Sequence, residues 1–504
     1  MIGTVLAAVA AFRAPTLDYH ALAPEIVLTC VIVAVLVIDL FVSERSKWVL
    51  ATLSGFGLLA AFVPVVTLAV DGADRSMFNG AWVVDNFALV LKGLFLLSAY
   101  VVVLLSSDEI ETGGYHQGEY YTLLLSSVLG MTMMASSRDL VSIFVALELL
   151  SIPAYMLAAW RKRDLKSNEA GLKYLLLGVF ASAVMLYGMS LLYGVAGSTV
   201  LTDISAAVAK TGDKSIIVLA VVFILVGFAF KVSAVPFHSW APDTYEGAPT
   251  PVTAFLSVAS KAAGFVALIE LVFVAFPSAK HIWQPLFWVL AAASMTLGNL
   301  VALRQTNIVR MFAYSSIAQG GFILMPLAVA GYGGQSGRDS LTAMVTYLAV
   351  YAAMNLGAFA IIIAVARKTR SGAISSYGGL FGYAPGLAVA MTIFLAALAG
   401  IPPAGGWIAK FYVFKAVMSA GPAGVVLGIV GVVNSVIAFG YYGNVMREIW
   451  MRPAPDGDTA PIKVPGSLSA ALVLTGTATL LIGVLPSVVL RFGNLTNLAG
   501  ALGK

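Results

Sequence analysis

Apolar runs of about 20 residues, separated by short charged or Gly/Pro-rich breaks, recur along the whole chain. A helix rises about 1.5 Å per residue, so such a run crosses a hydrocarbon core about 30 Å thick. The pattern predicts an all-α polytopic membrane protein, with residues 1–504 in a single membrane domain. About fourteen transmembrane helices are expected, at 22–42, 48–70, 86–106, 120–136, 139–160, 170–195, 215–245, 250–275, 283–303, 308–330, 340–366, 386–417, 423–447 and 467–490.

The seventh and twelfth spans are too long for one straight crossing, because each would extend past about 40 Å as a continuous helix. The seventh contains Pro236, and the twelfth contains Pro402 and Pro403. Backbone groups freed by proline must be satisfied by protein or water, and broken helices of this kind line ion paths in transporters. We therefore expect both helices to be discontinuous.

An internal repeat is expected from the positions of the two long spans. They are five spans apart, and an odd offset reverses direction through the membrane, as in an inverted-topology repeat. The predicted parts are helices 1–3 in 1–118, a first five-helix repeat (helices 4–8) in 119–275, a second, inverted repeat (helices 9–13) in 283–447, and a last helix at 467–490.

The composition excludes several classes of function. Hydrophobic residues make up 60% of the chain and charged residues 11%, whereas soluble domains have about 25% charged residues. The net charge of +5 comes from basic residues in short loops, so no nucleic-acid partner is expected. Cys30 is the one cysteine, and no CxxC or CxxH spacing is present to hold zinc, haem or an iron–sulfur cluster. No cofactor or metal is therefore expected in this chain.

Lysines and arginines in the loops predict the orientation. Loops after odd-numbered spans hold 14 of them, the other side with both termini holds 9, and six lie inside spans. The positive-inside rule makes the richer side cytoplasmic, which places both termini outside the cytoplasm. The first residues, MIGTVLAAVAAF, resemble the core of a signal peptide but lack its positive start, so a short retained segment is expected.

Five charged residues lie well inside apolar spans. A lysine near the bilayer centre costs about 2.5–3.5 kcal/mol, so five such charges without partners would cost on the order of 10–15 kcal/mol. They must pair, hydrate or become neutral, and an intramembrane charge is by default a functional candidate. The five are Glu148, Lys173, Lys231, Lys261 and Lys410, of which Lys231 and Lys410 lie near the prolines of the two long spans.

A lysine with a movable carboxylate partner can take up and release a proton, because burial favours its neutral form and the carboxylate favours its charged form. Glu148 is a candidate partner for Lys173 and Lys231 in alternation. His238 could relay protons between Lys231 and Lys261, or be a hydrogen-bonded structural histidine. Static salt bridges between helices are the alternative interpretation.

Three other charges near span ends have simpler interpretations. Glu25 is expected at the membrane interface, and Lys92 is expected to extend its amine to the interface. Lys415 could face the same cavity as Lys410, although pairing or interfacial exposure is favoured for it.

Four motifs resemble the antiporter-like subunits of respiratory complex I and the related Mrp cation/proton antiporters. They are FKVSAVPFHSWAPDTYEGAPTPVTAFLSVASKAAGF at 230–265, ALELLSIPAYML at 146–157, YSSIAQGGFIL at 314–324 and GIPPAGGWIAKFYVF at 400–414. Within that family, KYLLLGVFASAVMLYG at 173–188 and a lysine at position 410, where the M-type subunits have glutamate, are similar to the N-type subunits.

The resemblance implies a role for each candidate residue. Glu148 and Lys231 would form the charge pair of a first half-channel, and Lys173 would modulate that pair. Lys261 would be the central relay, and Lys410 would end the route in a second half-channel. Pro236, Pro402 and Pro403 would mark the breaks of the two discontinuous helices.

The resemblance also implies the setting in which the chain works. It would translocate protons in a bacterial inner membrane while flavin, iron–sulfur clusters and quinone act in partner subunits. Its neighbours would be an antiporter-like M-type subunit, small K- and J-type subunits, and the lipid bilayer. Alternatives are a subunit of an Mrp-type Na⁺/H⁺ antiporter, a subunit of a membrane-bound hydrogenase-type complex, and a structural membrane spacer with static salt bridges.

Overall fold

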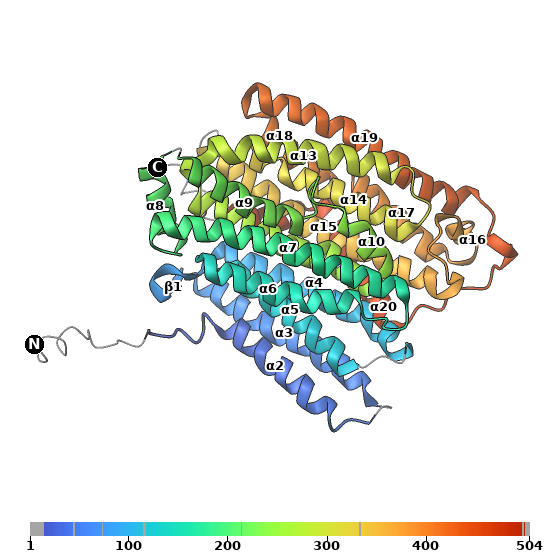
Figure 1. The fold of residues 1–504 in the computed structure, drawn as a ribbon. Coiled ribbons are helices and arrows are strands. Elements are labelled where there is room, and N and C mark those ends of the chain that lie inside the picture. Colours follow the sequence, from blue (N-terminus) through green and yellow to red (C-terminus); the bar gives the residue numbers. More distant parts are fainter. Residues whose placement is uncertain are drawn as a thin grey trace, which may run out of the picture.

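The computed structural model describes residues 15–43, 46–72, 74–113, 117–212, 214–331, 334–495 and 498. The expected N-terminal apolar segment and the two chain ends lie outside these residues. The first part of the chain forms long helices, and a small two-stranded hairpin lies at one end of them (Figure 1). These elements are α2 (Ala23–Asp39), α3 (Trp48–Asp71), β1 (Arg75–Met77), β2 (Trp82–Val84) and α4 (Asn86–Thr112). The two strands pair antiparallel, with Arg75 opposite Val84.

The middle of the chain continues as helices of very different lengths. They are α5 (Gln117–Ser136), α6 (Leu140–Ala158), α7 (Leu165–Ala196), α8 (Leu201–Thr211), α9 (Ser215–Lys231), α10 (Trp240–Gly247), α11 (Thr250–Phe255) and α12 (Lys261–Glu270). Two π-helical segments, Leu256–Ser260 and Leu271–Ala275, extend the last of these into one longer rod.

The last part of the chain adds a second group of helices. They are α13 (Lys280–Ala302), α14 (Ile308–Leu324), α15 (Gly334–Thr369), α16 (Leu380–Tyr383), α17 (Pro385–Ala399), α18 (Gly405–Met418), α19 (Gly421–Met451), α20 (Gly466–Val484) and α21 (Ser487–Leu495). Single 3₁₀ turns occur at Phe78–Gly80, Pro277–Ala279, Leu327–Val329, Ile374–Tyr377 and Pro455–Gly457.

The predicted class, an all-α membrane protein, is confirmed. In the described part of the chain, ten helices are long and apolar enough to cross a membrane, and α9 and α17 are shorter apolar helices. The count of fourteen spans and the division into two inverted repeats stay predictions.

Both long spans change conformation at the prolines noted in the sequence. The first helix ends at Lys231 and resumes at Trp240, and the second ends at Ala399 and resumes at Gly405. Val235–Pro236 and Pro402–Pro403 are cis peptide bonds. Gly400 has φ +90°, a left-handed conformation that ends a helix and that glycine adopts without a Cβ penalty.

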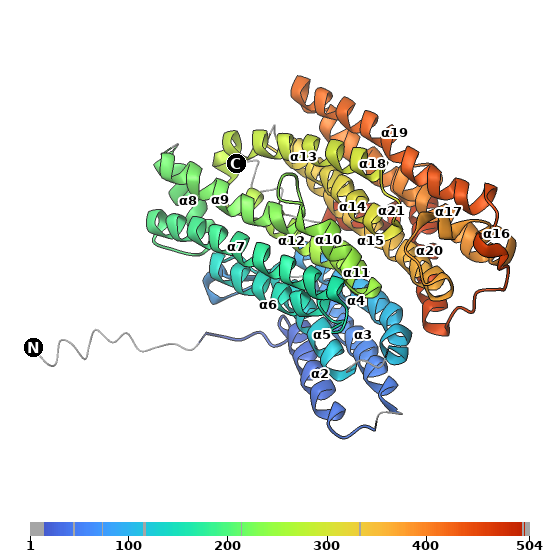
Figure 2. The ribbon, with the colours of Figure 1, turned by 45° about the vertical axis from the view of Figure 1, so that its right-hand side comes forward.

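The helices form one bundle with its most buried members in the middle (Figures 1 and 2). The rod made by α11 and α12, together with α14 and α15, is almost wholly buried, whereas α7, α19 and α20 expose much of their apolar surface. Close helix pairs rely on small residues. A Cβ on Gly130 of α5 would lie 2.5 Å from the Leu150 backbone nitrogen of α6, so only glycine fits there.

Candidate functional site

Lys231 is the last residue of α9, where the first long span breaks. Its Nζ donates to Ser151 Oγ at 2.9 Å, from α6, and to the Tyr174 hydroxyl at 3.3 Å, from α7. The side chain is buried. Two neighbouring helices thus provide neutral oxygen atoms for the amine.

Glu148 lies one turn before Ser151 on α6, so it occupies the same face of that helix. Its carboxylate accepts a hydrogen bond from Ser182 Oγ of α7 at 2.6 Å. In the part of the chain that the structure describes, Glu148 forms no ion pair with Lys173 or Lys231. The expected pairs are therefore not formed in this structure, although Glu148 lies within one helical turn of Ser151, which accepts a hydrogen bond from Lys231.

Lys173 belongs to a different, half-exposed ionic network. Its Nζ lies 2.6 Å from Glu169 and 2.7 Å from Asp243, and its side chain is 41% exposed. Asp243 and Glu246 of α10 also accept from Arg310 of α14, at 2.8 and 2.9 Å. This network ties the helix that follows the first break to α7 and α14.

Lys261 begins α12 directly after the π-helical segment Leu256–Ser260. A π-helical turn inserts one extra residue and re-aims the side chains beyond it, and such turns are frequent at functional sites. The Lys261 Nζ donates to Ser316 of α14, at 2.8 Å to Oγ and 3.1 Å to the backbone oxygen. Within the described residues, its hydrogen-bond partners are neutral.

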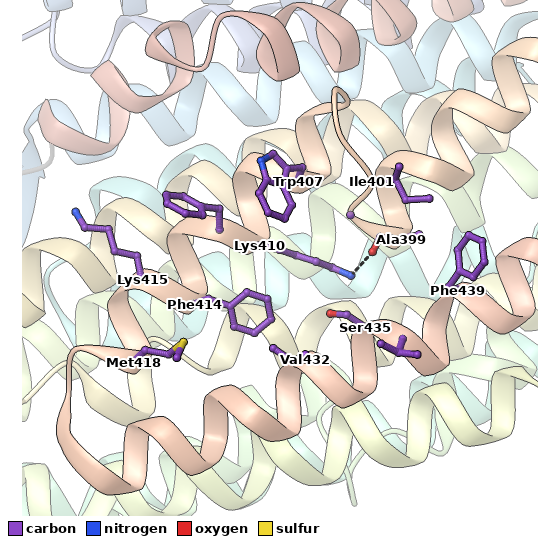
Figure 3. A pocket seen from close by; sticks show the side chains of 13 residues that line it. Ala399, Ile401, Trp407, Lys410, Phe414, Lys415, Met418, Val432, Ser435 and Phe439 are labelled. Atoms are coloured by element: carbon purple, nitrogen blue, oxygen red, sulfur yellow. Dashed lines mark hydrogen bonds between the residues drawn. The ribbon is translucent and has the colours of Figure 1, made fainter.

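Lys410 lies on α18 and reaches back across the second break. Its Nζ donates to the Ala399 carbonyl at 2.9 Å and lies 4.7 Å from the centre of the Phe322 ring. Lys410 lines a pocket of about 820 Å³ with residues of α18 and α19, among them Ser435 and Lys415. Figure 3 shows the Lys410 amine directed toward Ala399, while the Lys415 amine points away from the Lys410 amine. Lys415 is half-exposed and lies 3.7 Å from Asp339, as the pairing expectation indicated.

Lys231, Lys261 and Lys410 share one environment, and we call them the lysine row. Each is only 2–4% exposed, and each amine is held by hydroxyl or carbonyl oxygen atoms. His238 has different contacts from the lysine row. Its Nδ1 is 3.3 Å from the Pro236 carbonyl, and the structure shows no contact from its ring to either of the neighbouring lysines among the described residues. Its relay role stays a prediction.

The expectation that Lys92 extends its amine to the interface is wrong, and Glu25, expected at the interface, is its buried partner. Lys92 of α4 is fully buried, with its Nζ 2.9 Å from Glu25 of α2 and 5.2 Å from the centre of the Trp82 ring. Neighbouring helices cover α4 on most sides, so the amine cannot reach an interface. A charge buried in this way requires an opposite partner, and Glu25 is buried with it.

A second buried ionic cluster was missed in the sequence. Arg138 lies between Asp85 at 3.2 Å and Glu270 at 2.5 Å. It is 4% exposed, and Glu270 is fully buried at the end of α12. The one available signal was that Glu270 falls inside an apolar run. Among the residues described, no group of three or more His, Cys, Asp or Glu side chains could hold a metal ion.

Comparison with known sequences gives a consistent result. Residues 137–438 match the family described as NADH:quinone oxidoreductase/Mrp antiporter, TM. The chain is 41% identical over 480 residues to NADH-quinone oxidoreductase subunit N of Trichlorobacter lovleyi, covering 95% of this chain and 96% of that protein. It is 40% identical to NADH-quinone oxidoreductase subunit N of Moorella thermoacetica, covering 93% and 96%.

Solved structures have the same architecture. A chain of respiratory complex I from Thermus thermophilus is 31% identical with a TM-score of 0.76, over 93% of this chain and 98% of that one. A chain of the Mrp complex from Dietzia sp. has a TM-score of 0.82 at 20% identity, over 96% and 97%, and so shares the fold. This chain belongs to the NADH:quinone oxidoreductase/Mrp antiporter family of transmembrane subunits.

Proposed function

We propose that this chain is the proton-translocating N-type membrane subunit of an NADH:quinone oxidoreductase. The observation that carries the proposal is the lysine row, whose three buried amines are held by neutral oxygen atoms. A hydroxyl or carbonyl accepts a hydrogen bond from a charged ammonium and from a neutral amine alike. Such a lysine can therefore change its protonation state without leaving a carboxylate unpaired in the membrane.

Each candidate residue then has a role in the proposed route. Glu148, one turn from a Lys231 ligand, would move toward or away from Lys231 and so favour or disfavour its charged form. Lys173 would act on α10, the helix that follows the break after Lys231, through its ion pair with Asp243. Lys261 would pass the change on, and Lys410 would end the route beside the second break.

The redox chemistry would take place in other subunits. The relatives named NADH-quinone oxidoreductase subunit N support assembly with subunits that oxidise NADH and reduce quinone. We propose that flavin, iron–sulfur clusters and quinone act in those partner subunits. We propose M-type, K-type and J-type membrane subunits as neighbours, in a bacterial inner membrane with both termini outside the cytoplasm. Electron transfer would be coupled to the lysine row through electrostatic changes at the subunit boundary, a pathway that requires measured coupling.

Quinone-linked proton pumping in vesicles tests the proposal. Lys231→Ala should assemble, as judged by native gel, and should pump fewer protons per electron than the unchanged complex. Lys280→Ala is the matched control, because the Lys280 amine is exposed and donates to the Gly331 carbonyl. Unchanged pumping per electron in Lys231→Ala contradicts the proposed route, and loss of assembly alone favours a structural spacer with static charges.

An Mrp-type Na⁺/H⁺ antiporter subunit is the second candidate, supported by the shared fold with the Dietzia sp. chain. Sodium separates the two functions. Proton movement that follows NADH oxidation in sodium-free buffer supports the oxidoreductase subunit, and proton movement that requires sodium but no quinone reduction supports the antiporter. Copurified nickel or molybdenum proteins would instead indicate a hydrogenase-type complex.

A further inference from the structure

One face of α14 contacts both Lys261 and Lys410 through residues spaced three apart. Ser316 accepts from Lys261, and Phe322 lies under the Lys410 amine. Gln319 lies between them on the same face and is 1% exposed. This single helix therefore lies against the amines of two members of the lysine row, with an amide side chain in the middle.

Gln319 and Lys410 share the broken end of α17. The last carbonyls of a helix have no partner inside that helix and carry its negative partial charge. The Leu398 carbonyl accepts from Gln319 Nε2 at 3.0 Å, and the adjacent Ala399 carbonyl accepts from Lys410 Nζ. The break at Gly400 thus exposes two neighbouring acceptors, one for the amide and one for the amine.

The orientation of the Gln319 amide is fixed by its neighbours. The Leu398 carbonyl can only accept, so the NH₂ group must face α17 and Oε1 must face the other way. Oε1 accepts from the Tyr347 hydroxyl of α15. The same NH₂ group lies 3.3 Å from the Tyr442 hydroxyl of α19, which is 2.6 Å from Ser315 Oγ. The amide is therefore held from three helices besides its own.

We infer that Gln319 is a positioning residue that couples Lys410 to Lys261 through the end of α17 and the face of α14. The inference rests on the proposed function. When Lys410 loses its charge, its hydrogen bond to the Ala399 carbonyl weakens. The hydrogen bond from Gln319 to the Leu398 carbonyl then contributes more to holding the end of α17. The resulting shift of Gln319 moves Ser316, one turn earlier on α14, which accepts the hydrogen bond of Lys261. The coupling needs no proton on the amide, and none of these groups contacts a carboxylate within the described residues.

The test is Gln319→Leu in the complete complex, in vesicles supplied with NADH and a short-chain quinone. Leucine has a similar volume and removes every hydrogen bond of the amide. The expected result is normal assembly with a loss of protons pumped per electron as large as that of Lys231→Ala. Gln305→Leu is the matched control, because Gln305 lies in the loop before α14 and, among the described residues, its amide donates only to the Val301 carbonyl.

Unchanged pumping per electron in Gln319→Leu overturns the inference when Lys231→Ala has lost pumping in the same assay. If Lys231→Ala also pumps normally, the proposed function itself fails. If Gln319→Leu does not assemble, Tyr347→Phe decides, since it removes one hydroxyl and keeps the ring. A fall in protons per electron with Tyr347→Phe supports the coupling, and an unchanged ratio overturns it.

Discussion

Two groups of buried basic residues in this molecule differ in their partners and not in their depth. Lys92 and Arg138, in the N-terminal half, are paired with the carboxylates of Glu25 and Glu270. The lysine row is equally buried, but neutral oxygen atoms hold its amines. A carboxylate fixes a neighbouring basic group in its charged form, whereas a hydroxyl or carbonyl does not. Under the proposed function, we therefore expect Lys92 and Arg138 to be structural charges and the lysine row to be the group that changes protonation.

The largest effect on stability is expected at Arg138, which neutralises two acids at once. Arg138→Leu leaves Asp85 and Glu270 without a counter-charge, and removing one partner of a buried pair costs about 3–5 kcal/mol. We expect a strong loss of assembled subunit on native gels, which the exposed Arg338→Leu should not cause. Normal assembly with fewer protons pumped per electron would instead place Arg138 among the working charges.

A smaller loss is expected for Lys92→Met. Glu25 lines a pocket of about 440 Å³, so water can partly replace the lost ammonium. Thermal unfolding of the detergent-solubilised complex should show lower stability, and adding Glu25→Gln should restore part of it. A double variant that is no more stable than Lys92→Met would mean that the pair is not the cause.

Lys261→Met should affect stability still less. The variant loses the hydrogen bonds to Ser316 and leaves no carboxylate unpaired among the described residues, so a change of about 1 kcal/mol is expected. Pumping per electron should nevertheless fall, because the central member of the lysine row is gone. A loss of stability as large as that of Arg138→Leu would remove the distinction between the two groups.

The smallest effect is expected for a partly buried pair outside the membrane spans. Hydrogen bonding to Arg75 at 2.6 Å lowers the pKa of Asp18 below its usual range. A carboxyl with a lowered pKa in the folded state stabilises the fold above its unfolded pKa, and that contribution is lost as the pH falls. Asp18→Asn should therefore be slightly less stable than the unchanged protein at neutral pH. The difference should disappear in acid, which thermal unfolding at several pH values would show.

The fold class and the helix breaks followed from local features of the sequence. The length of an apolar run shows whether a helix can span a membrane, and proline and glycine change the backbone conformation at their own positions. Pro236 and Pro403 therefore fall within the interruptions that the structure contains. Three of the five charges singled out, Lys231, Lys261 and Lys410, are deeply buried.

Depth along a helix was less predictable. The helix that carries Lys173 has 32 residues, and the Lys173 side chain, in its third turn, is half-exposed. Lys92 lies in a similar apolar run but is covered on every side. The sequence has no signal that separates these two cases, because the covering residues belong to other helices.

The sequence by itself determined that this protein is a bundle of membrane helices with breaks at given prolines and charges inside apolar runs. Only the tertiary structure decided what each charge touches. Lys231 donates a hydrogen bond to Ser151, which is 80 residues away in the sequence. Lys261 donates to Ser316, which is 55 residues away. Helical periodicity predicts which face of a helix a residue occupies, but the side chains that pack against that face belong to another helix. Whether a buried lysine meets a carboxylate or a hydroxyl is therefore a property of the packed bundle.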